Sequence, residues 1–471
     1  MKSYKLFCGG EFIESSSKKN IKNKFTREDF ATVCFADEAI LENAIHMAQA
    51  CAAQLDSLSS GEKSNSLKYI SDQLLANKKY LAEILSIESG KPIIYALVEI
   101  ERAAQTFLIA AEECKRLPNE YLSLDWTTNG KGKEGLVKYF PAGIVAGISP
   151  FNFPMNLAVH KIAPAIAAGC PIILKPASST PLSTLELAGI IATSGLPKGA
   201  VSILPMDRGT GNLLVTDYRI NVLSFTGSPE IGWELKKQSG KKKVVLELGG
   251  NAGVIISKGT EIKKIIDKCI GGAFAYSGQI CIHAQRFYVH ESLFDDFVTE
   301  MKNASSKLVT GDPLNEETRF SHMIDEENAK RVENWVKEAT AQGAKLICGG
   351  KRSGSFFEPT LLTNTTISMK VNCEEVFGPI ACIEKYNGTI KEAIKLVNES
   401  KFGLQCGIFT DSVKELDEVF NKVKVGGVIH NDVPTLRFDH MPYGGVKESG
   451  MGREGVKYAM MDMMEAKILV K

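Results

Sequence analysis

The chain has 471 residues, of which 44% are apolar and 24% are charged. This composition is that of a soluble globular protein, and the length predicts two or three domains. Its 56 basic and 55 acidic residues leave a net charge of +1, so the charge balance does not indicate a nucleic-acid or anionic-membrane partner.

Targeting and redox patterns indicate a cytoplasmic protein. Residues 1–10 lack the apolar run of a signal peptide, and the longest apolar region, residues 157–174, is interrupted by polar residues and prolines. We therefore expect no membrane span. The eleven cysteines are scattered without a Cys-x-x-Cys pair, which predicts reduced thiols and neither a disulfide framework nor a metal site.

The N-terminal quarter predicts a hairpin followed by helices. Residues 4–15 favour the hairpin, and a helical pattern extends from about 38 to 116. Ser59 and Glu62 have the spacing of a capping box, and Pro92 suits the first turn of a later helix.

A polar, turn-rich segment at residues 118–135 predicts a second hairpin that stands apart from the helices. We expect it to form an oligomerisation arm. The tail, residues 455–471, ends in a predicted edge strand.

Between these segments, strand and helix patterns alternate, which predicts parallel sheets with helices on both faces. A second alternating block covers roughly residues 252–447. In the first block the candidate strands are 143–148, 172–175, 201–204 and 222–225, and the candidate helices lie near 154–168, 180–194 and 229–239.

Glu247 and Cys281 are the leading candidates for chemistry. Glu247 lies in Glu-Leu-Gly-Gly-Asn and Cys281 ends Gly-Gln-Ile-Cys. A thiol can attack an electrophilic carbon, and a carboxylate can activate the water that releases the product. Two further segments suit a nucleotide at strand ends: Lys175–Ser178, and Phe225–Gly232, where a proline opens a helix.

These segments belong to a set of seven, which in order and spacing resembles the aldehyde dehydrogenase superfamily and covers most of the chain. The loop 431–447 is similar to that of the lactaldehyde dehydrogenase branch, near the non-phosphorylating glyceraldehyde-3-phosphate enzymes. The seven are Pro150-Phe151-Asn152-Phe153-Pro154, Lys175-Pro176-Ala177, Phe225-Thr226-Gly227-Ser228, Glu247-Leu248-Gly249-Gly250, Gly278-Gln279-Ile280-Cys281, Glu374-Glu375-Val376-Phe377-Gly378-Pro379 and Pro442-Tyr443-Gly444-Gly445.

The resemblance implies an α/β fold of two parallel-sheet, Rossmann-like domains and a β-hairpin arm. It implies a cofactor-binding domain at 1–118 and 138–249, a catalytic domain at 250–447, and an oligomerisation arm at 119–137 and 455–471. A homodimer or homotetramer is expected.

By similarity, Cys281 is the nucleophile that forms a thiohemiacetal and then a thioester. Asn152 donates to the oxyanion, and Glu247 activates the water that hydrolyses the thioester. Because branches that pass the acyl group to coenzyme A usually lack this glutamate, the expected product is a free carboxylic acid.

The resemblance also implies a site for NAD or NADP. Many NAD-selective relatives carry a glutamate where this chain has Ser178, so no carboxylate repels a 2′-phosphate and NADP becomes admissible. The implied cofactor-binding residues are Ser149, Pro150, Phe151, Lys161, Lys175, Ala177, Ser178, Gly211, Phe225, Thr226, Gly227, Ser228, Ile231, Leu248, Gly249, Glu375 and Phe377.

The expected substrate is a short polar aldehyde such as lactaldehyde, glyceraldehyde or succinic semialdehyde. Ile280 replaces an arginine that relatives with phosphorylated substrates commonly place before the cysteine. Arg102, His283, Arg437 and His440 are the candidate substrate contacts. Broad specificity for aliphatic aldehydes is the alternative.

Two other functions remain open at this point. A cofactor-free cysteine hydrolase or acyltransferase would need a histidine base near the thiol and would bind no nucleotide. A non-catalytic role on the same fold is disfavoured by the presence of Cys281, Glu247 and Asn152 together.

Overall fold

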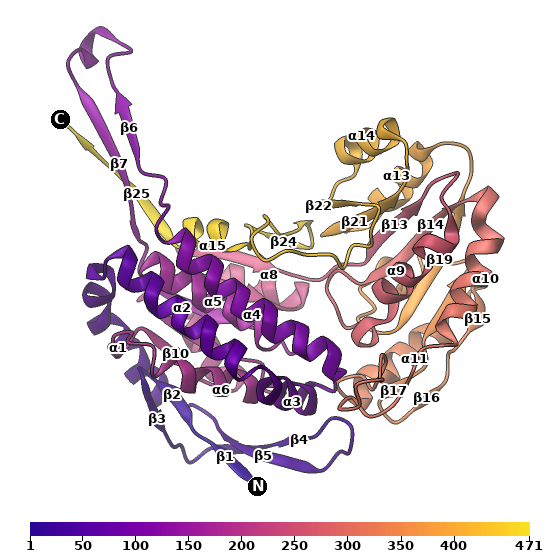
Figure 1. Cartoon of the computed structure of the whole chain (residues 1–471), viewed down its shortest axis with the longest axis horizontal. Coiled ribbons are helices and arrows are strands. Elements are labelled where there is room, and N and C mark those ends of the chain that lie inside the picture. Colours follow the sequence, from indigo (N-terminus) through magenta and orange to yellow (C-terminus); the bar gives the residue numbers. More distant parts are fainter.

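Two α/β units lie side by side in the computed structural model of the chain, which describes all 471 residues (Figure 1). A narrow three-stranded sheet projects from the first unit. The predicted fold class is confirmed, since each unit is built on its own largely parallel sheet. No helix combines the length and apolar character needed to cross a bilayer.

The first unit contains an eight-stranded sheet with the order β24-β12-β11-β8-β9-β10-β2-β3. Its five central strands are parallel, and the hairpin β2–β3 and strand β24 pair antiparallel at the edges. The predicted strands and N-terminal hairpin are confirmed. The bounds are β2 Leu6–Cys8, β3 Glu11–Ile13, β8 Ile144–Ile148, β9 Ile172–Lys175, β10 Val201–Ile203, β11 Ile220–Thr226, β12 Lys243–Glu247 and β24 Gly450–Met451.

Helices cover both faces of this sheet. Helix α5 is buried along its whole length, as expected for a helix that is apolar on nearly all sides and packs between the sheet and other helices. The predicted capping box at Ser59 is present. The bounds are α1 Glu38–Ser57, α2 Ser60–Ala76, α3 Lys78–Ser89, α4 Ile93–Glu113, α5 Asn156–Ala168, α6 Leu182–Ile191, α7 Arg208–Thr216 and α8 Pro229–Gln238.

Three N-terminal strands form a separate small sheet with the order β1-β5-β4. They are β1 Lys2–Tyr4, β4 Lys18–Lys22 and β5 Asp29–Cys34. The sequence pattern did not predict them.

The second unit is built on a seven-stranded sheet with the order β15-β18-β19-β14-β13-β21-β22, parallel except for β15. Its strands are β13 Ala252–Ile256, β14 Ala284–His290, β15 Lys345–Cys348, β18 Thr360–Thr363, β19 Ile380–Tyr386, β21 Gln405–Phe409 and β22 Gly427–His430. Its helices are α9 Ile262–Phe274, α10 Phe294–Ser305, α11 Glu326–Ala341, α12 Lys370–Cys373, α13 Ile390–Asn398 and α14 Val413–Lys422, and two short pairs are β16 Arg352–Ser353 with β17 Phe356–Phe357 and β20 Phe402–Gly403 with β23 Val446–Lys447.

The projecting sheet joins the predicted hairpin to the C-terminal tail. Strand β7 (Glu134–Pro141) pairs antiparallel with β6 (Glu120–Ser123) on one side and with β25 (Met464–Val470) on the other. Helix α15 (Val456–Asp462) packs against α5 in the body. The predicted tail segment 455–471 therefore divides, and only the part from Met464 onward lies in the arm.

Candidate active site

A cavity of about 340 Å³ lies between the two units, where β11 and β12 end. Open parallel sheets bind ligands at this carboxyl edge. Asn152 and Glu247 come from the first unit, and Cys281 and Glu375 from the second. The other lining residues are Pro150, Phe151, Leu157, Thr226, Gly227, Ser228, Leu248, Gly249, Asn328, Arg331 and Phe377.

Cys281 follows a strained turn at the end of α9. Tyr276 and Ser277 have left-handed φ angles of 47° and 53°, which cost a non-glycine residue about 1–3 kcal/mol each. Tyr276 Oη donates to Ser89 O at 3.1 Å, and Ser277 Oγ donates to Ser321 O at 2.7 Å. These bonds fix the loop that presents the part-buried thiol to the cavity.

Asn152, on the loop before α5, reaches the same turn. Its Nδ2 donates to Gln279 O at 2.9 Å, and the residue is buried. Gln279 is two residues before Cys281, so the amide lies beside the backbone of the thiol's own loop. An amide donor placed there can stabilise an oxyanion, a role typically worth about 3–4 kcal/mol.

Glu247, at the end of β12, is buried, and neither of its carboxylate oxygens has a hydrogen-bond partner. Burial and the neighbouring Glu454 carboxylate raise the pKa of Glu247 well above its ordinary value. A carboxylate without protein partners in a cavity is free to bind and deprotonate water. A Cβ at Gly444 would crowd this carboxylate, which explains the glycine there.

Glu454 is a second buried carboxylate in this region. It forms ion pairs with Lys161 at 3.3 Å and with Arg437 at 3.0 Å. Burial alone would raise the pKa of Glu454, but the charges of Lys161 and Arg437 outweigh it and hold that pKa at about 2. The two neighbouring acids, Glu247 and Glu454, therefore differ sharply in acidity, the pattern expected when one of them acts as a base.

The cavity wall near Glu375 is shaped for close approach of a ligand. The carboxylate of Glu375 accepts from Gly250 N at 3.0 Å, and burial raises its pKa to about 7. A Cβ at Gly249 would collide with the same carboxylate. Phe377 has a left-handed φ of 44° and packs edge-on against Phe151 with ring centroids 5.7 Å apart. The Phe151–Phe377 wall suits a flat ring, and the Glu375 carboxylate suits a ribose hydroxyl.

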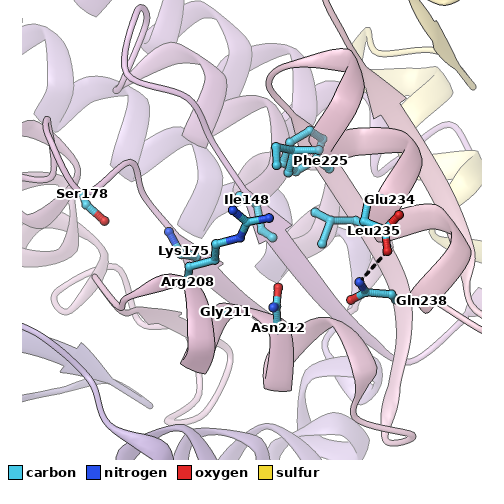
Figure 2. Close-up of a pocket in the computed structure, with 11 residues that line it drawn as sticks. Ile148, Lys175, Ser178, Arg208, Gly211, Asn212, Phe225, Glu234, Leu235 and Gln238 are labelled. Atoms are coloured by element: carbon cyan, nitrogen blue, oxygen red, sulfur yellow. Dashed lines mark hydrogen bonds between the residues drawn. The ribbon is translucent and has the colours of Figure 1, made fainter. Parts of the chain in front are cut away.

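A second pocket of about 290 Å³ lies beyond the ends of β8 and β9 (Figure 2). Lys175 and Arg208 line it, and Figure 2 shows both side chains among the residues that surround the pocket. Neither makes an ion pair or a side-chain hydrogen bond. Ser178 lies at one end, and the other lining residues are Ile148, Gly211, Asn212, Phe225, Ile231, Glu234, Leu235 and Gln238. Two unpaired cations beside an apolar slot suit a nucleoside with an attached phosphate.

The ring of Tyr443 lies between Arg437 and the Cys281 thiol. Its guanidinium carbon lies 3.7 Å from the centroid of the Tyr443 ring, and Tyr443 Oη lies 3.0 Å from Cys281 Sγ. Arg437 Nη2 donates to Glu454, whereas its buried Nε has no partner. Arg102 Nε and Nη2 donate to Asp439 of the same loop, at 3.1 and 2.6 Å.

A sequence profile of the aldehyde dehydrogenase family matches residues 12–469. The chain belongs to the aldehyde dehydrogenase family. It is therefore an NAD(P)-dependent aldehyde oxidoreductase, and the cofactor-free hydrolase is set aside. Solved members of the family hold NADP or NAD⁺.

Individual relatives resemble the chain over nearly its full length. It is 41% identical over 471 residues to 3-sulfolactaldehyde dehydrogenase from Priestia aryabhattai, covering 100% of this chain and 98% of the relative. Lactaldehyde dehydrogenase from Methanococcus aeolicus is 37% identical over 472 residues, with 99% of each chain covered. The structure of aldehyde dehydrogenase 21 from Physcomitrella patens, in complex with the reaction product succinate, superposes with a TM-score of 0.98 at 44% identity, covering 100% of this chain and 98% of that one. These names agree with the predicted lactaldehyde-type branch.

Most predicted residues of this aldehyde dehydrogenase line one of the two pockets, but three predicted cofactor contacts do not. Lys161 is buried, and its ammonium donates to Ser224, Thr226 and Glu454. The ammonium is thus fully engaged in contacts within the protein, beneath Thr226. Ser149 is buried and Ala177 is part-buried; both lie in loops beside the pockets and outside their lining.

None of the four predicted substrate contacts lines either pocket. His283 is buried with its Nε2 2.9 Å from Ala273 O, and burial lowers its pKa to about 4. It therefore packs under α9 as a neutral ring. His440 is exposed and stacks loosely near Phe438. Arg102 and Arg437 remain proposed substrate contacts, because both interact with the loop whose Tyr443 reaches the Cys281 thiol.

Several residues of the site were not predicted, among them Glu454, Tyr443, Arg208 and Arg331. Glu454 follows a glycine-rich turn, as Glu247 precedes one, and that shared pattern was the available signal. Tyr443 lay inside a recognised segment without a role. Arg208 and Arg331 carry no local signal, since only the fold brings them to the pockets.

Proposed function

We propose that the enzyme oxidises short aldehydes with an anionic or hydroxylated end to the free acid. Cys281 adds to the aldehyde carbon, and the carbonyl electron pair moves to an oxygen held by Asn152. NAD(P) supplies the hydride acceptor when bound. Glu247 then removes a proton from water, which attacks the resulting thioester carbonyl and releases the acid and the thiol. The proximity of Asn152 to the Cys281 loop and the partner-free carboxylate of Glu247 support these roles.

One observation carries the substrate assignment: the buried Nε of Arg437, which has no partner. A buried guanidinium N–H without an acceptor is costly. Arg437 is not part of the cavity lining and lies behind the Tyr443 ring, so its positive charge favours a substrate with an anionic or hydroxylated end. The Arg437–Tyr443 stack leads directly to the Cys281 thiol. Arg102 binds the same loop, because its guanidinium donates to Asp439.

The relatives support the same class of substrate. Two of them are dehydrogenases of 3-sulfolactaldehyde and lactaldehyde, and one solved relative holds succinate. These molecules are short and carry a sulfonate, a hydroxyl or a carboxylate near the reacting carbon. Lactaldehyde, glyceraldehyde and succinic semialdehyde therefore remain proposed substrates, and 3-sulfolactaldehyde joins them.

For the cofactor we infer that NADP is used and that Arg208 contributes to its binding. Lys175, Ser178 and Arg208 line one pocket, and no carboxylate stands at position 178. Two unpaired cations favour an added phosphate. The carboxylate of Glu375 and the glycine backbone at 227 and 249 line the other end of the site.

The domain roles are proposed on the same basis. Residues 1–118 and 138–249 hold most of the cofactor pocket, and 250–447 carry the thiol. The arm exposes Tyr121, Trp126 and Leu469, which suits contact with a second copy of the chain in a homo-oligomer.

An aldehyde panel tests the function. With NADP, succinic semialdehyde, 3-sulfolactaldehyde or lactaldehyde should give a higher kcat/KM than hexanal or benzaldehyde. Should hexanal or benzaldehyde exceed every short polar aldehyde, the substrate assignment is wrong and the aldehyde dehydrogenase activity alone stands.

A further inference from the structure

Tyr443 provides the only side-chain hydrogen-bond partner of the Cys281 thiol. Its Oη lies 3.0 Å from Sγ, and its side chain is buried. The backbone of Tyr443 is fixed by two bonds to Glu454, at 2.9 and 2.6 Å, and its ring by the guanidinium of Arg437. The hydroxyl is therefore held against the sulfur by contacts on both sides.

The surroundings of Cys281 disfavour the thiolate, and the Tyr443 hydroxyl is one of two groups that favour it. Burial raises the pKa of Cys281 to about 11, and the carboxylates of Glu375 and Glu247 also raise it. Tyr443 and Arg437 act in the opposite direction. No lysine or histidine side chain hydrogen-bonds the sulfur, so a neutral donor must supply the contact that many reactive thiols receive from a cation.

We propose that Tyr443 is a catalytic residue whose hydroxyl donates a hydrogen bond to the Cys281 thiolate, with Arg437 holding its ring in place. The inference rests on the proposed role of Cys281 as nucleophile. The thiol releases its proton to water, and Tyr443 keeps its own. When sulfur bonds to the aldehyde carbon, the carbonyl pair moves to oxygen, and the now neutral sulfur no longer needs the tyrosine donor.

The test is the pH dependence of Cys281 alkylation in Tyr443→Phe. Iodoacetamide forms an S–C bond with thiolate and expels iodide, and mass spectrometry of the Cys281 peptide measures the rate with and without NADP. Loss of a hydrogen bond to a charged group should raise the apparent thiol pKa by about 1–2 units. Because the remaining thiolate is more nucleophilic, alkylation at neutral pH should slow only about 3- to 10-fold.

Tyr386→Phe is the matched control, because Tyr386 is also buried but lies at the end of β19 and does not contact the thiol. It should leave the alkylation profile unchanged. Thermal unfolding of both variants shows whether the fold is retained.

Three outcomes separate this inference from the proposed function. A raised thiol pKa with a matching alkaline shift of kcat/KM supports it. An unchanged alkylation profile in Tyr443→Phe overturns it, including the case in which only the KM of hydroxylated aldehydes rises, because Tyr443 would then bind substrate. If complete alkylation of Cys281 leaves turnover intact, the proposed nucleophile itself is wrong.

Discussion

Lys161 Nζ lies 3.3 Å from Glu454 Oε1 in a region that solvent does not reach, beneath the end of the first sheet. The same ammonium donates to Thr226 at 2.7 Å, and Thr226 lines the cavity. The pair therefore links a buried charge to the wall of the cavity, while Lys161 itself lines neither pocket.

Lys161→Met should destabilise the enzyme by at most about 3–5 kcal/mol, because it leaves a buried carboxylate with Arg437 as its remaining ion-pair partner. The folded-state pKa of Glu454, about 2, lies below the ordinary 4.5. Its stabilisation is thus complete above pH 4.5 and is lost as pH falls through about 2. Urea unfolding should show the largest difference from wild type near neutral pH and a smaller one below pH 4.

Lys175→Met provides the control for this stability measurement, since Lys175 has no ion pair or side-chain hydrogen bond in the structure. It should change unfolding free energy far less. Equal losses in the two variants would show that the Glu454 pair is not the cause.

Cys281→Ala should abolish aldehyde oxidation while leaving cofactor binding intact, because only the covalent step is lost. Fluorescence titration with NADPH measures binding, and NADPH production measures turnover. Near-normal turnover in this variant would rule out the thiohemiacetal mechanism.

Glu247→Gln should form the acyl-enzyme and release it slowly. Hydride transfer precedes the water step, so stopped-flow absorbance should show a burst of NADPH and then a slow steady state. Since the pKa of Glu247 is raised and the base must be ionised, the wild-type steady-state rate should climb with pH through that raised value. The slow steady-state rate of the Glu247→Gln variant should not show this rise with pH. Release of acid at the wild-type rate would assign the base elsewhere.

The sequence predicted the alternating core of the fold but missed several exposed or irregular elements. Strand β4 has a single buried residue, Ile21, so no period-two pattern marks it. Helix α7 contains Gly209 and Gly211, which disfavour a helix locally. Its Asp207 cap, which accepts from Thr210 N at 2.8 Å, and packing on the sheet override that propensity.

Prediction of the site followed the same division. Asn152, Glu247 and Cys281 lie in recognisable segments and meet in one cavity. The environment of Lys161 could not be predicted, because Glu454 is 293 residues away in the chain. His283 follows the nucleophile by two positions, yet the backbone at the start of β14 directs it to Ala273 O.

Ser178→Glu should weaken NADP binding more than NAD binding, because a carboxylate at that position repels a 2′-phosphate. Arg208→Ala should also raise the KM for NADP more than that for NAD, about 10-fold or more if it loses a charged hydrogen bond. Steady-state kinetics with both cofactors measure the two ratios. Equal effects on NAD and NADP would show that this pocket does not contact the ribose phosphate.

The last prediction concerns discrimination by the substrate's distal group. Lactaldehyde should have a higher kcat/KM than propanal, which lacks one hydroxyl, and succinic semialdehyde should exceed butanal, which lacks the carboxylate. The positive charge of Arg437, which lies behind the Tyr443 ring, has no counterpart on the apolar analogue. Arg437→Gln should therefore reduce the carboxylate ratio by about 10-fold or more. Because both aldehydes are measured on one variant, general damage to the site cancels.

Arg219→Gln, which breaks ion pairs with Glu42 and Asp217 away from the cavity, should leave the ratio unchanged. An unaltered ratio in Arg437→Gln would remove Arg437 from the substrate site and leave Arg102 as the remaining arginine to test.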